Sequence, residues 1–153
     1  MEEKQLLKDL LSDNPELRQT ATRALWNLWL GQAGEKAEFR IRKGTKIMDI
    51  GQHKLAQKEF ENLVVDYPKF AEAHNKLATV LYLQRKYNES IKECEITLKM
   101  NPNHFGAWNG LGLCHYQLAN YPMAIESFKT ALAIQPFADF NKVYIARCRG
   151  QLN

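Results

Sequence analysis

The sequence predicts an all-α protein built as a right-handed solenoid of helical repeats, a superhelix whose units share one extended core. Two observations predict this fold class. The stretch from Ala37 to Ala138 repeats itself every 34 residues without a gap, and no alternating apolar pattern is long enough for a β-strand. A period of this size is typical of stacked helical pairs, because one such unit cannot bury its apolar face alone.

Residues that recur at one place in each unit fix the register of the repeats. The small residues at one such place are Gly44, Ala78 and Gly112, and the prolines at another are Pro68, Pro102 and Pro136. Proline ends each unit because its ring cannot continue a helix. Each unit therefore gives two helices. We expect the first helices near 37–50, 71–84 and 105–118, and the second helices near 54–67, 88–100 and 122–135.

The segments on either side of the array are also predicted to be helical. Residues 1–12 form a short helix, and a second runs from Pro15 to about Leu30 with apolar residues at three-four spacing. After the array, Asp139 to Gly150 has the pattern of an amphipathic helix that covers the last apolar face. The predicted organisation is an N-terminal helical pair (1–36), three units (37–70, 71–104 and 105–138) and a C-terminal capping helix (139–153). The sequence leaves open whether the N-terminal pair caps the first unit or closes over the array's groove.

Charge and composition restrict the classes of partner and compartment. The chain has 21 basic and 17 acidic residues, and the basic ones are not pooled in one patch, so nucleic-acid binding is only weakly favoured. No stretch approaches the roughly 20 apolar residues that span a bilayer, and the N-terminus lacks the continuous apolar core of a secretory signal. Three cysteines without a CxxC pair fit free thiols. We therefore expect the cytoplasm or another reducing intracellular compartment, an organelle stroma included.

The sequence carries none of the common catalytic or nucleotide-binding motifs. There is no HExxH, no GxSxG, no P-loop and no dinucleotide fingerprint. His74 and His115 stand at places that core aromatic residues normally hold, which favours a structural role over metal binding. Cys94 stands where the neighbouring units carry Phe60 and Phe128, which favours a small buried apolar residue. We therefore expect no enzyme, no metal site and no cofactor.

These recurring residues resemble the tetratricopeptide repeat (TPR). The third unit fits the family pattern best, with Trp108, Leu111, Gly112, Tyr121, Ala124, Phe128, Ala131 and Pro136. The middle unit has His74 where the pattern has tryptophan, and the first has Arg40 and Lys43 at places that are usually apolar. The resemblance covers about two thirds of the chain. The first 36 residues lie outside it and look more like one HEAT-type helix pair.

The resemblance implies a non-catalytic adaptor that binds a peptide or protein segment along its concave face, which the first helix of each unit lines. The predicted partner-binding residues are Thr45, Met48, Asn75, Thr79, Tyr82, Asn109, Leu113, Tyr116 and Arg147. The equivalent Asn75 and Asn109 amides offer a donor and an acceptor to an extended peptide backbone, unless they bond a neighbouring helix instead. Replacing both by alanine is expected to weaken partner capture and to leave the melting temperature nearly unchanged.

One subtype of the family is disfavoured by the residues present. Chaperone-binding members carry a two-carboxylate clamp of lysine, asparagine and arginine side chains. The matching places here hold Ile41, Thr45, Lys76, Gly106 and Gly110. The sequence therefore predicts an adaptor, with a co-chaperone or assembly role, that lacks this clamp.

The sequence is also compatible with two alternative functions. RNA binding is one, because related helical-pair repeats read RNA and the chain is basic. Self-association is the other, through Trp26, Trp29 and the apolar N-terminal helix. A steep salt dependence would favour the first, and a concentration-dependent mass would favour the second.

Overall fold

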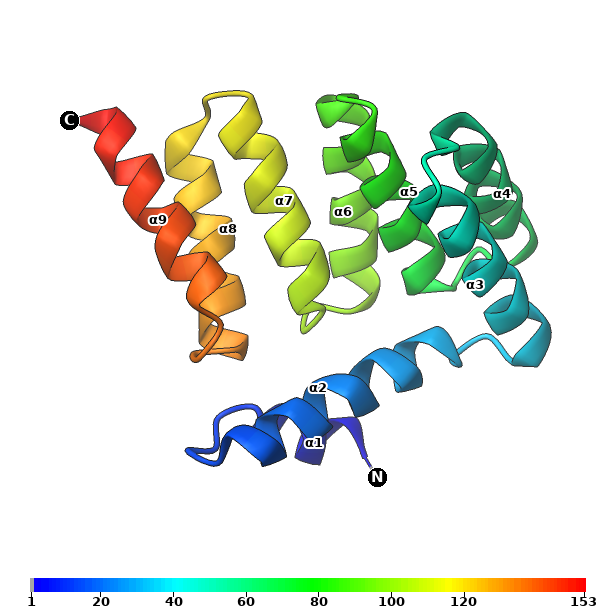
Figure 1. Cartoon of the computed structure of the whole chain (residues 1–153), viewed down its shortest axis with the longest axis horizontal. Helices are drawn as coiled ribbons and strands as arrows, with labels where there is room; N and C mark the ends of the chain where they lie inside the picture. The colour runs from blue at the N-terminus through cyan, green and yellow to red at the C-terminus, as the bar shows by residue number, and fades with distance from the viewer. Residues whose placement is uncertain (1) are drawn as a thin grey trace.

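A computed structural model describes residues 2–153 and confirms the all-α helical-repeat solenoid (Figure 1). Nine helices and no strand are present in that range. They are α1 (Glu3–Asp9), α2 (Pro15–Leu30), α3 (Glu35–Asp49), α4 (His53–Asp66), α5 (Ala71–Leu83), α6 (Tyr87–Met100), α7 (Phe105–Gln117), α8 (Tyr121–Ile134) and α9 (Asp139–Leu152). The predicted helix over residues 1–12 is shorter in the structure, because it ends at Asp9. The exact boundaries of the repeat units stay a prediction.

The two helices of each unit are joined by the same left-handed turn. Its central residue is Gly51, Arg85 or Ala119, with φ of 86°, 64° and 58°. The following amide closes the turn onto the preceding helix, as in the bond from Lys86 N to Leu81 O at 2.9 Å. Only the first unit uses glycine here. The other two accept the roughly 1 kcal/mol that a side chain costs in this conformation.

Close helix packing within a unit depends on glycine in the first and third units. A Cβ atom at Gly44 would lie 2.6 Å from Cε1 of Phe60, and one at Gly112 would lie 2.7 Å from Cε1 of Phe128. Both phenylalanine rings are fully buried. Glycine inside a helix costs up to about 1 kcal/mol relative to alanine, and burial of the ring against the glycine backbone offsets that cost. The helices therefore approach closely at two of the three places where the sequence repeats a small residue.

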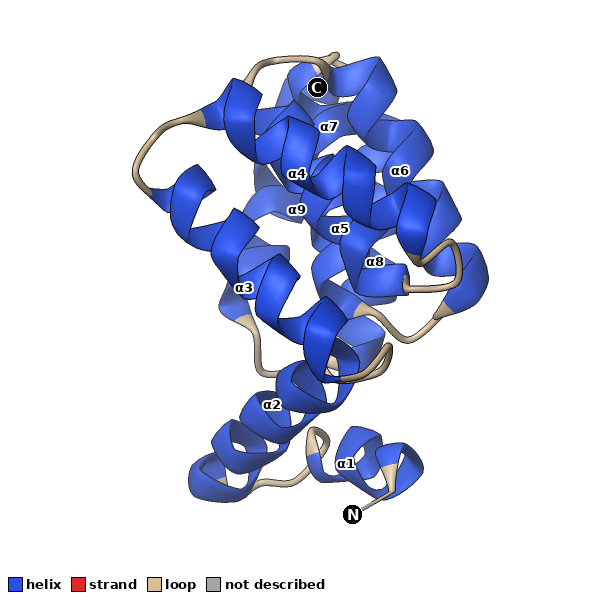
Figure 2. Ribbon diagram, turned by 90° about the vertical axis from the view of Figure 1, so that its right-hand side faces the viewer, coloured by secondary structure: helices blue, strands red, loops and turns tan. Residues whose placement is uncertain are grey.

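The N-terminal pair lies across the ends of the array rather than on its first unit. Figures 1 and 2 both place α2 along the edge from which α5, α7 and α9 start, with α1 on its outer side. Leu6 and Leu10 of α1 pack on Leu25 and Trp29 of α2. Trp29 also contacts Phe105 at the start of α7. The pair therefore spans several units along one edge instead of capping the first.

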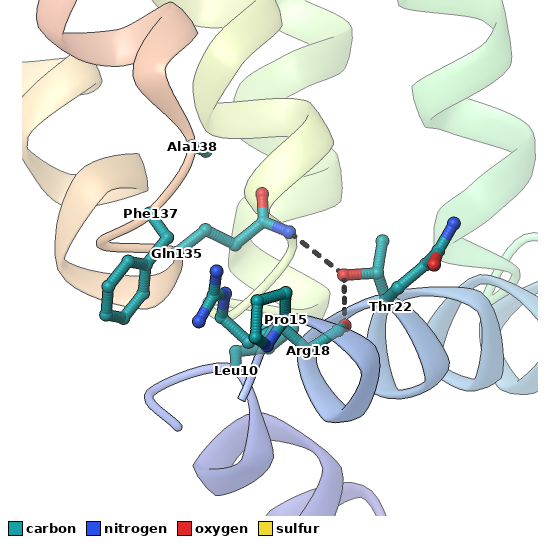
Figure 3. Close-up of a pocket in the computed structure, with 8 residues that line it drawn as sticks. Leu10, Pro15, Arg18, Thr22, Gln135, Phe137 and Ala138 are labelled. Atoms are coloured by element: carbon teal, nitrogen blue, oxygen red, sulfur yellow. Dashed lines mark hydrogen bonds between the residues drawn. The ribbon is translucent and has the colours of Figure 1, made fainter. Parts of the chain in front are cut away.

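The N-terminal end of α2 contacts the loop that follows α8. The guanidinium carbon of Arg18 lies 3.9 Å from the ring centroid of Phe137, and Gln135 Nε2 donates to Thr22 Oγ1 over 3.5 Å (Figure 3). Between these contacts lies a pocket of about 230 Å³. Polar and cation–π contacts therefore hold the N-terminal end of α2 against the array, whereas apolar packing surrounds Trp29 near its C-terminal end.

The departures of the first unit from the family pattern follow from the position of α2. Ala73 and Ala107 are fully buried in clusters with residues of α4 and α6 respectively. The equivalent residue of α3, Phe39, is 72% exposed. Lys43 is exposed on the same helix, and Arg40 bonds Asp66 at 2.7 Å. Charged side chains are thus tolerated at these places because the array begins there and little covers this face.

Candidate functional site

The residues predicted to bind a partner lie on α3, α5, α7 and α9, the helices that line the concave face. We call this face the concave groove. Six of the nine side chains are partly exposed, namely Thr45, Thr79, Tyr82, Asn109, Leu113 and Tyr116. Arg147 is exposed, and its guanidinium carbon lies 4.9 Å from the Tyr144 ring centroid. Met48 and Asn75 are each only 7% exposed, so they offer a partner little surface.

A cavity of about 170 Å³ opens into the concave groove between α5 and α7, with α6 as its floor. We call it the α5/α7 cavity. It brings together five of the predicted residues, Asn75, Thr79, Tyr82, Asn109 and Leu113. Thr45, Met48, Tyr116 and Arg147 lie outside it.

Half of the lining was not among the predicted site residues. These additional residues are Ala78, Ser90, Cys94, Gly106 and Gly110. The sequence feature that could have identified these residues is their small side-chain volume. Cys94 stands where the other units have phenylalanine, which the sequence shows, but only the packing reveals that the missing volume faces the groove.

Both groove asparagines bond within the protein. Asn109 Nδ2 donates to Asn141 Oδ1 on the neighbouring helix α9, which is the alternative left open from the sequence. Asn75 Nδ2 donates to Glu72 Oε1 over 2.9 Å, and Glu72 is fully buried. Alanine at 75 would leave a buried carboxylate oxygen without this donor, at a cost of about 1–3 kcal/mol. We therefore now expect the change at Asn75 to lower the melting temperature of the double alanine variant.

A fully buried Glu–His pair lies beneath the cavity, where α2, α5 and α7 meet. His104 Nε2 donates to Glu72 Oε2 over 2.7 Å, and both side chains are 0% exposed. His104 Nδ1 accepts from Ala107 N over 3.0 Å and caps α7. Because Nδ1 accepts, the ring is neutral and carries its proton on Nε2. Trp29 stacks on this ring with centroids 4.5 Å apart, so α2 covers the pair from outside.

His115 faces a second groove, on the side of α7 away from the α5/α7 cavity. This groove of about 490 Å³ lies between α6 and α8 and includes Trp108, Met123 and Glu95 in its lining. The His115 side chain is buried, and its Nδ1 lacks a hydrogen-bond partner within residues 2–153. Burial lowers the pKa of His115, and the nearby Glu95 carboxylate offsets part of that effect.

Replacing His115 by leucine, the residue at the equivalent place 81, is expected to flatten the pH dependence of stability. The unfolded chain takes up a proton at this ring below its ordinary pKa of 6.5, whereas the folded chain resists it because its pKa is lower. Folded stability is therefore lost as the pH falls through the ordinary pKa of 6.5. Urea unfolding near pH 7.5 and pH 5.5 measures this. An H115L variant that loses as much stability as the wild type would contradict the assignment.

The three cysteines are buried and free. Burial raises the pKa of the Cys94, Cys114 and Cys148 thiols, so these free, buried side chains are poor nucleophiles. Within residues 2–153, no group of three or more His, Cys, Asp or Glu side chains could hold a metal ion. Over the same range, none of the helices has the length and apolar character needed to cross a membrane.

Comparison with known families agrees with this geometry. Two sequence profiles, both described as tetratricopeptide repeat, match residues 44–96 and 106–137. The chain belongs to the tetratricopeptide repeat family. Within this TPR protein, α1 and α2 lie outside both matched ranges, so the helical pair along the edge is an addition to the family's repeat.

Individual relatives share the repeats over part of their length. The tetratricopeptide repeat-containing protein trd-1 of Caenorhabditis elegans is 27% identical over 81 residues, which are 52% of this chain and 10% of the relative. The chloroplastic protein PYG7 of Arabidopsis thaliana is 21% identical over 131 residues, 78% of this chain and 44% of the relative. This chain thus spans less than half the length of these curated relatives.

Solved structures share the fold at low sequence identity. The first TPR of Spaghetti (RPAP3), bound to the HSP90 peptide SRMEEVD, superimposes with a TM-score of 0.74 at 16% identity. The match covers 76% of this chain and 93% of that chain. At this identity the likeness establishes the TPR architecture alone.

Proposed function

We propose that this TPR protein is a non-catalytic interaction module that binds a peptide or protein segment along its concave groove, as a co-chaperone or assembly factor. The observation that carries the proposal is a row of partly exposed side chains at equivalent places of successive units, including Thr79, Leu113, Tyr82 and Tyr116. The row is continued by a cavity between α5 and α7. The structural relative bound to an HSP90 peptide supports the same use of the fold.

The bound segment is recognised without a carboxylate clamp. The places of that clamp hold the fully buried Ile41, the polar Thr45, Lys76 and two glycines, Gly106 and Gly110. Lys76 is the one cation among these five places, whereas capture of a C-terminal carboxylate by the clamp depends on several charge-assisted hydrogen bonds. We therefore expect an internal segment of a partner, held by backbone hydrogen bonds and apolar contacts.

The groove offers polar groups suited to a peptide backbone. Burial raises the pKa of Tyr82, so its phenol is neutral and can donate as well as accept. Its oxygen accepts only one long bond, from Gln117 Nε2 at 3.4 Å. Tyr116 packs edge-on against Tyr121 and Tyr144, with centroids 5.8 Å and 5.2 Å apart. Rings held in this way present contact area at little entropic cost on binding.

Replacing Thr79 by arginine is expected to abolish partner capture and to leave folding intact. Thr79 is partly exposed at the cavity mouth, and its Oγ1 bonds only its own helix, at Asn75 O. A long cation there would block the groove. The matched control is Thr130→Arg, since Thr130 Oγ1 makes the same bond to Glu126 O on α8, outside the concave groove.

The measurement is a quantitative pull-down from native extract with and without nuclease, beside melting curves for both variants. A protein recovered by wild type and T130R but lost with T79R supports the proposal. Equal recovery by all three contradicts it. Material that disappears with nuclease would instead favour RNA, for which the exposed cations Arg42, Lys43 and Lys46 on α3 would be the first surface to map.

We propose a reducing intracellular compartment as its location. The three cysteines are buried and free. Free thiols of this kind persist where disulfide formation is disfavoured.

A further inference from the structure

The α5/α7 cavity lies where three places that carry larger side chains elsewhere in the array hold small residues, and two of these places leave the volume empty. Cys94 stands where Phe60 and Phe128 fill the equivalent gaps. Gly110 stands where the neighbouring first helices have Lys76 and Tyr144. Gly106 is also small, but its place is taken up by α2, since a Cβ atom there would lie 2.7 Å from Cη2 of Trp26. The cavity is therefore the result of Cys94 and Gly110 together.

The two small residues of the second unit, Ala78 and Cys94, do not fill the volume that a phenylalanine ring occupies in the other units. Units one and three pair a glycine with a phenylalanine ring, whereas unit two pairs Ala78 with Cys94. One methyl group and one thiol replace a whole ring, and both residues line the cavity. An unfilled volume and a glycine within a helix both lower stability. Both features lower stability at the α5/α7 gap, whereas phenylalanine rings fill the equivalent places in units one and three. A local cost in stability of this kind is expected where residues serve binding.

A buried polar group also faces this cavity. Asn75 lines it and is only 7% exposed. Its Nδ2 is fixed on Glu72 Oε1, because a carboxylate accepts hydrogen bonds and cannot donate them. The carbonyl oxygen Oδ1 of Asn75 therefore points away from Glu72. It is not among the fully buried side-chain atoms of residues 2–153 that lack a partner, so it is open to solvent at the cavity. It is an acceptor available to a ligand's N–H group.

We propose that the α5/α7 cavity holds one apolar side chain of phenylalanine size from the bound segment, while the adjoining backbone N–H donates to Asn75 Oδ1. This inference rests on the proposed function, peptide binding in the concave groove, and names the chemistry of the residue that is bound. The volume of about 170 Å³ is close to that of cavities that admit benzene, about 150 Å³.

The floor of the cavity favours an apolar occupant. Ser90 Oγ donates to Ala78 O over 2.7 Å and accepts from Cys114 Sγ over 3.3 Å, so its donor and one of its two acceptor lone pairs are used. Burial raises the pKa of the Cys94 thiol, which therefore stays neutral. A charged or amide side chain that reached this floor would lose hydration there and find no free hydrogen-bond donor on Ser90. The polar groups at the mouth, including Thr79 and Asn109, suit the peptide backbone instead.

The test uses N-acetyl-phenylalanine amide as the smallest probe with both the side chain and the backbone N–H. N-acetyl-lysine amide, which has the same backbone groups and a charged tail, is the control probe. Titration followed by amide NMR is expected to shift Thr79, Asn109 and Leu113, with a Kd of about 1 mM. The lysine probe is expected to leave these signals in place.

The matched variant is Ala78→Gly with Cys94→Phe, which recreates the glycine–phenylalanine pair of units one and three. Both changes are needed, because a Cβ atom opposite such a ring would lie closer than 3 Å, as at Gly44 and Gly112. The filled variant is expected to melt no lower than wild type and to bind the phenylalanine probe about tenfold more weakly.

Gly110→Ala gives a second and milder variant. The added Cβ atom would lie 3.4 Å from Cys94 Sγ, an ordinary contact. We expect a melting temperature about 2–4 °C higher and weaker probe binding. Higher stability with lower affinity is a combination that a purely structural role for Gly110 does not give.

The outcomes separate this inference from the proposed function. A wild-type protein that does not respond to the phenylalanine probe, or variants that bind it as well as wild type does, overturn the inference even if the pull-down recovers a partner. Probe binding that the filled variant loses supports it. If the pull-down then recovers no protein, the proposed function fails while the assignment of the cavity stands.

Discussion

Glu72→Ala is expected to lower the melting temperature by about 10 °C. The carboxylate is 0% exposed and accepts from His104 Nε2 at 2.7 Å and from Asn75 Nδ2 at 2.9 Å. Alanine leaves both donors buried without an acceptor. Each buried donor left without an acceptor costs about 1–3 kcal/mol, and each kcal/mol corresponds to about 2–4 °C for a chain of this length.

The second His–Glu pair of the array is the matched control. His74 Nδ1 and Glu93 Oε2 lie 2.6 Å apart, but their side chains are 8% and 20% exposed. Water can replace a lost partner there, so Glu93→Ala is expected to lower the melting temperature by about a third as much. Thermal unfolding followed by circular dichroism compares the two. Equal losses would contradict the view that full burial makes the Glu72 pair indispensable.

Trp29→Ala is expected to have a similarly large effect, because this side chain joins α1, α2 and α7. It is 4% exposed, stacks on His104 and donates from Nε1 to Glu3 Oε1 over 3.1 Å. Replacing a buried tryptophan by alanine costs about 3–5 kcal/mol. The neighbouring Leu28 is 41% exposed, so Leu28→Ala is expected to stay within about 0.5 kcal/mol of wild type.

The double variant of Glu72 and Trp29 measures how the two residues cooperate. Both contact His104, one through a hydrogen bond and one through its ring face. Residues that share a partner usually do not contribute additively. We therefore expect the double variant to lose less stability than the sum of the two single variants. A W29A protein that unfolds like L28A would show that α2 is not docked on the array in solution.

The periodic part of the fold could be predicted from the sequence, because repeat signals are local. The 34-residue period fixed the helix order, and the recurring small residues marked the close approach that Gly44 and Gly112 make to the buried rings of Phe60 and Phe128. The candidate groove followed from the same register, since first helices of stacked units share one face. The role of its residues in binding stays a prediction.

The less predictable features all depend on contacts between residues far apart in the chain. No motif in the sequence singles out His104, yet it pairs with Glu72, 32 residues earlier. The sequence left open whether Asn109 faces a ligand or a neighbouring helix, and the structure shows its bond to Asn141 on the next first helix. No local pattern encodes such partners, because a helix places its polar side chains the same way whether water or another helix faces them.

The sequence by itself therefore determined that this protein is a TPR array with a concave face, because a repeated unit can bury its apolar residues only by stacking. The tertiary structure alone decided where the N-terminal pair lies and which groove residues remain accessible. The apolar face of α2 could have packed on α3 or along the array's edge, and the packing of Trp26 and Trp29 against α7 selects the edge. The cavity likewise depends on which small residues of α6 and α7 meet in space.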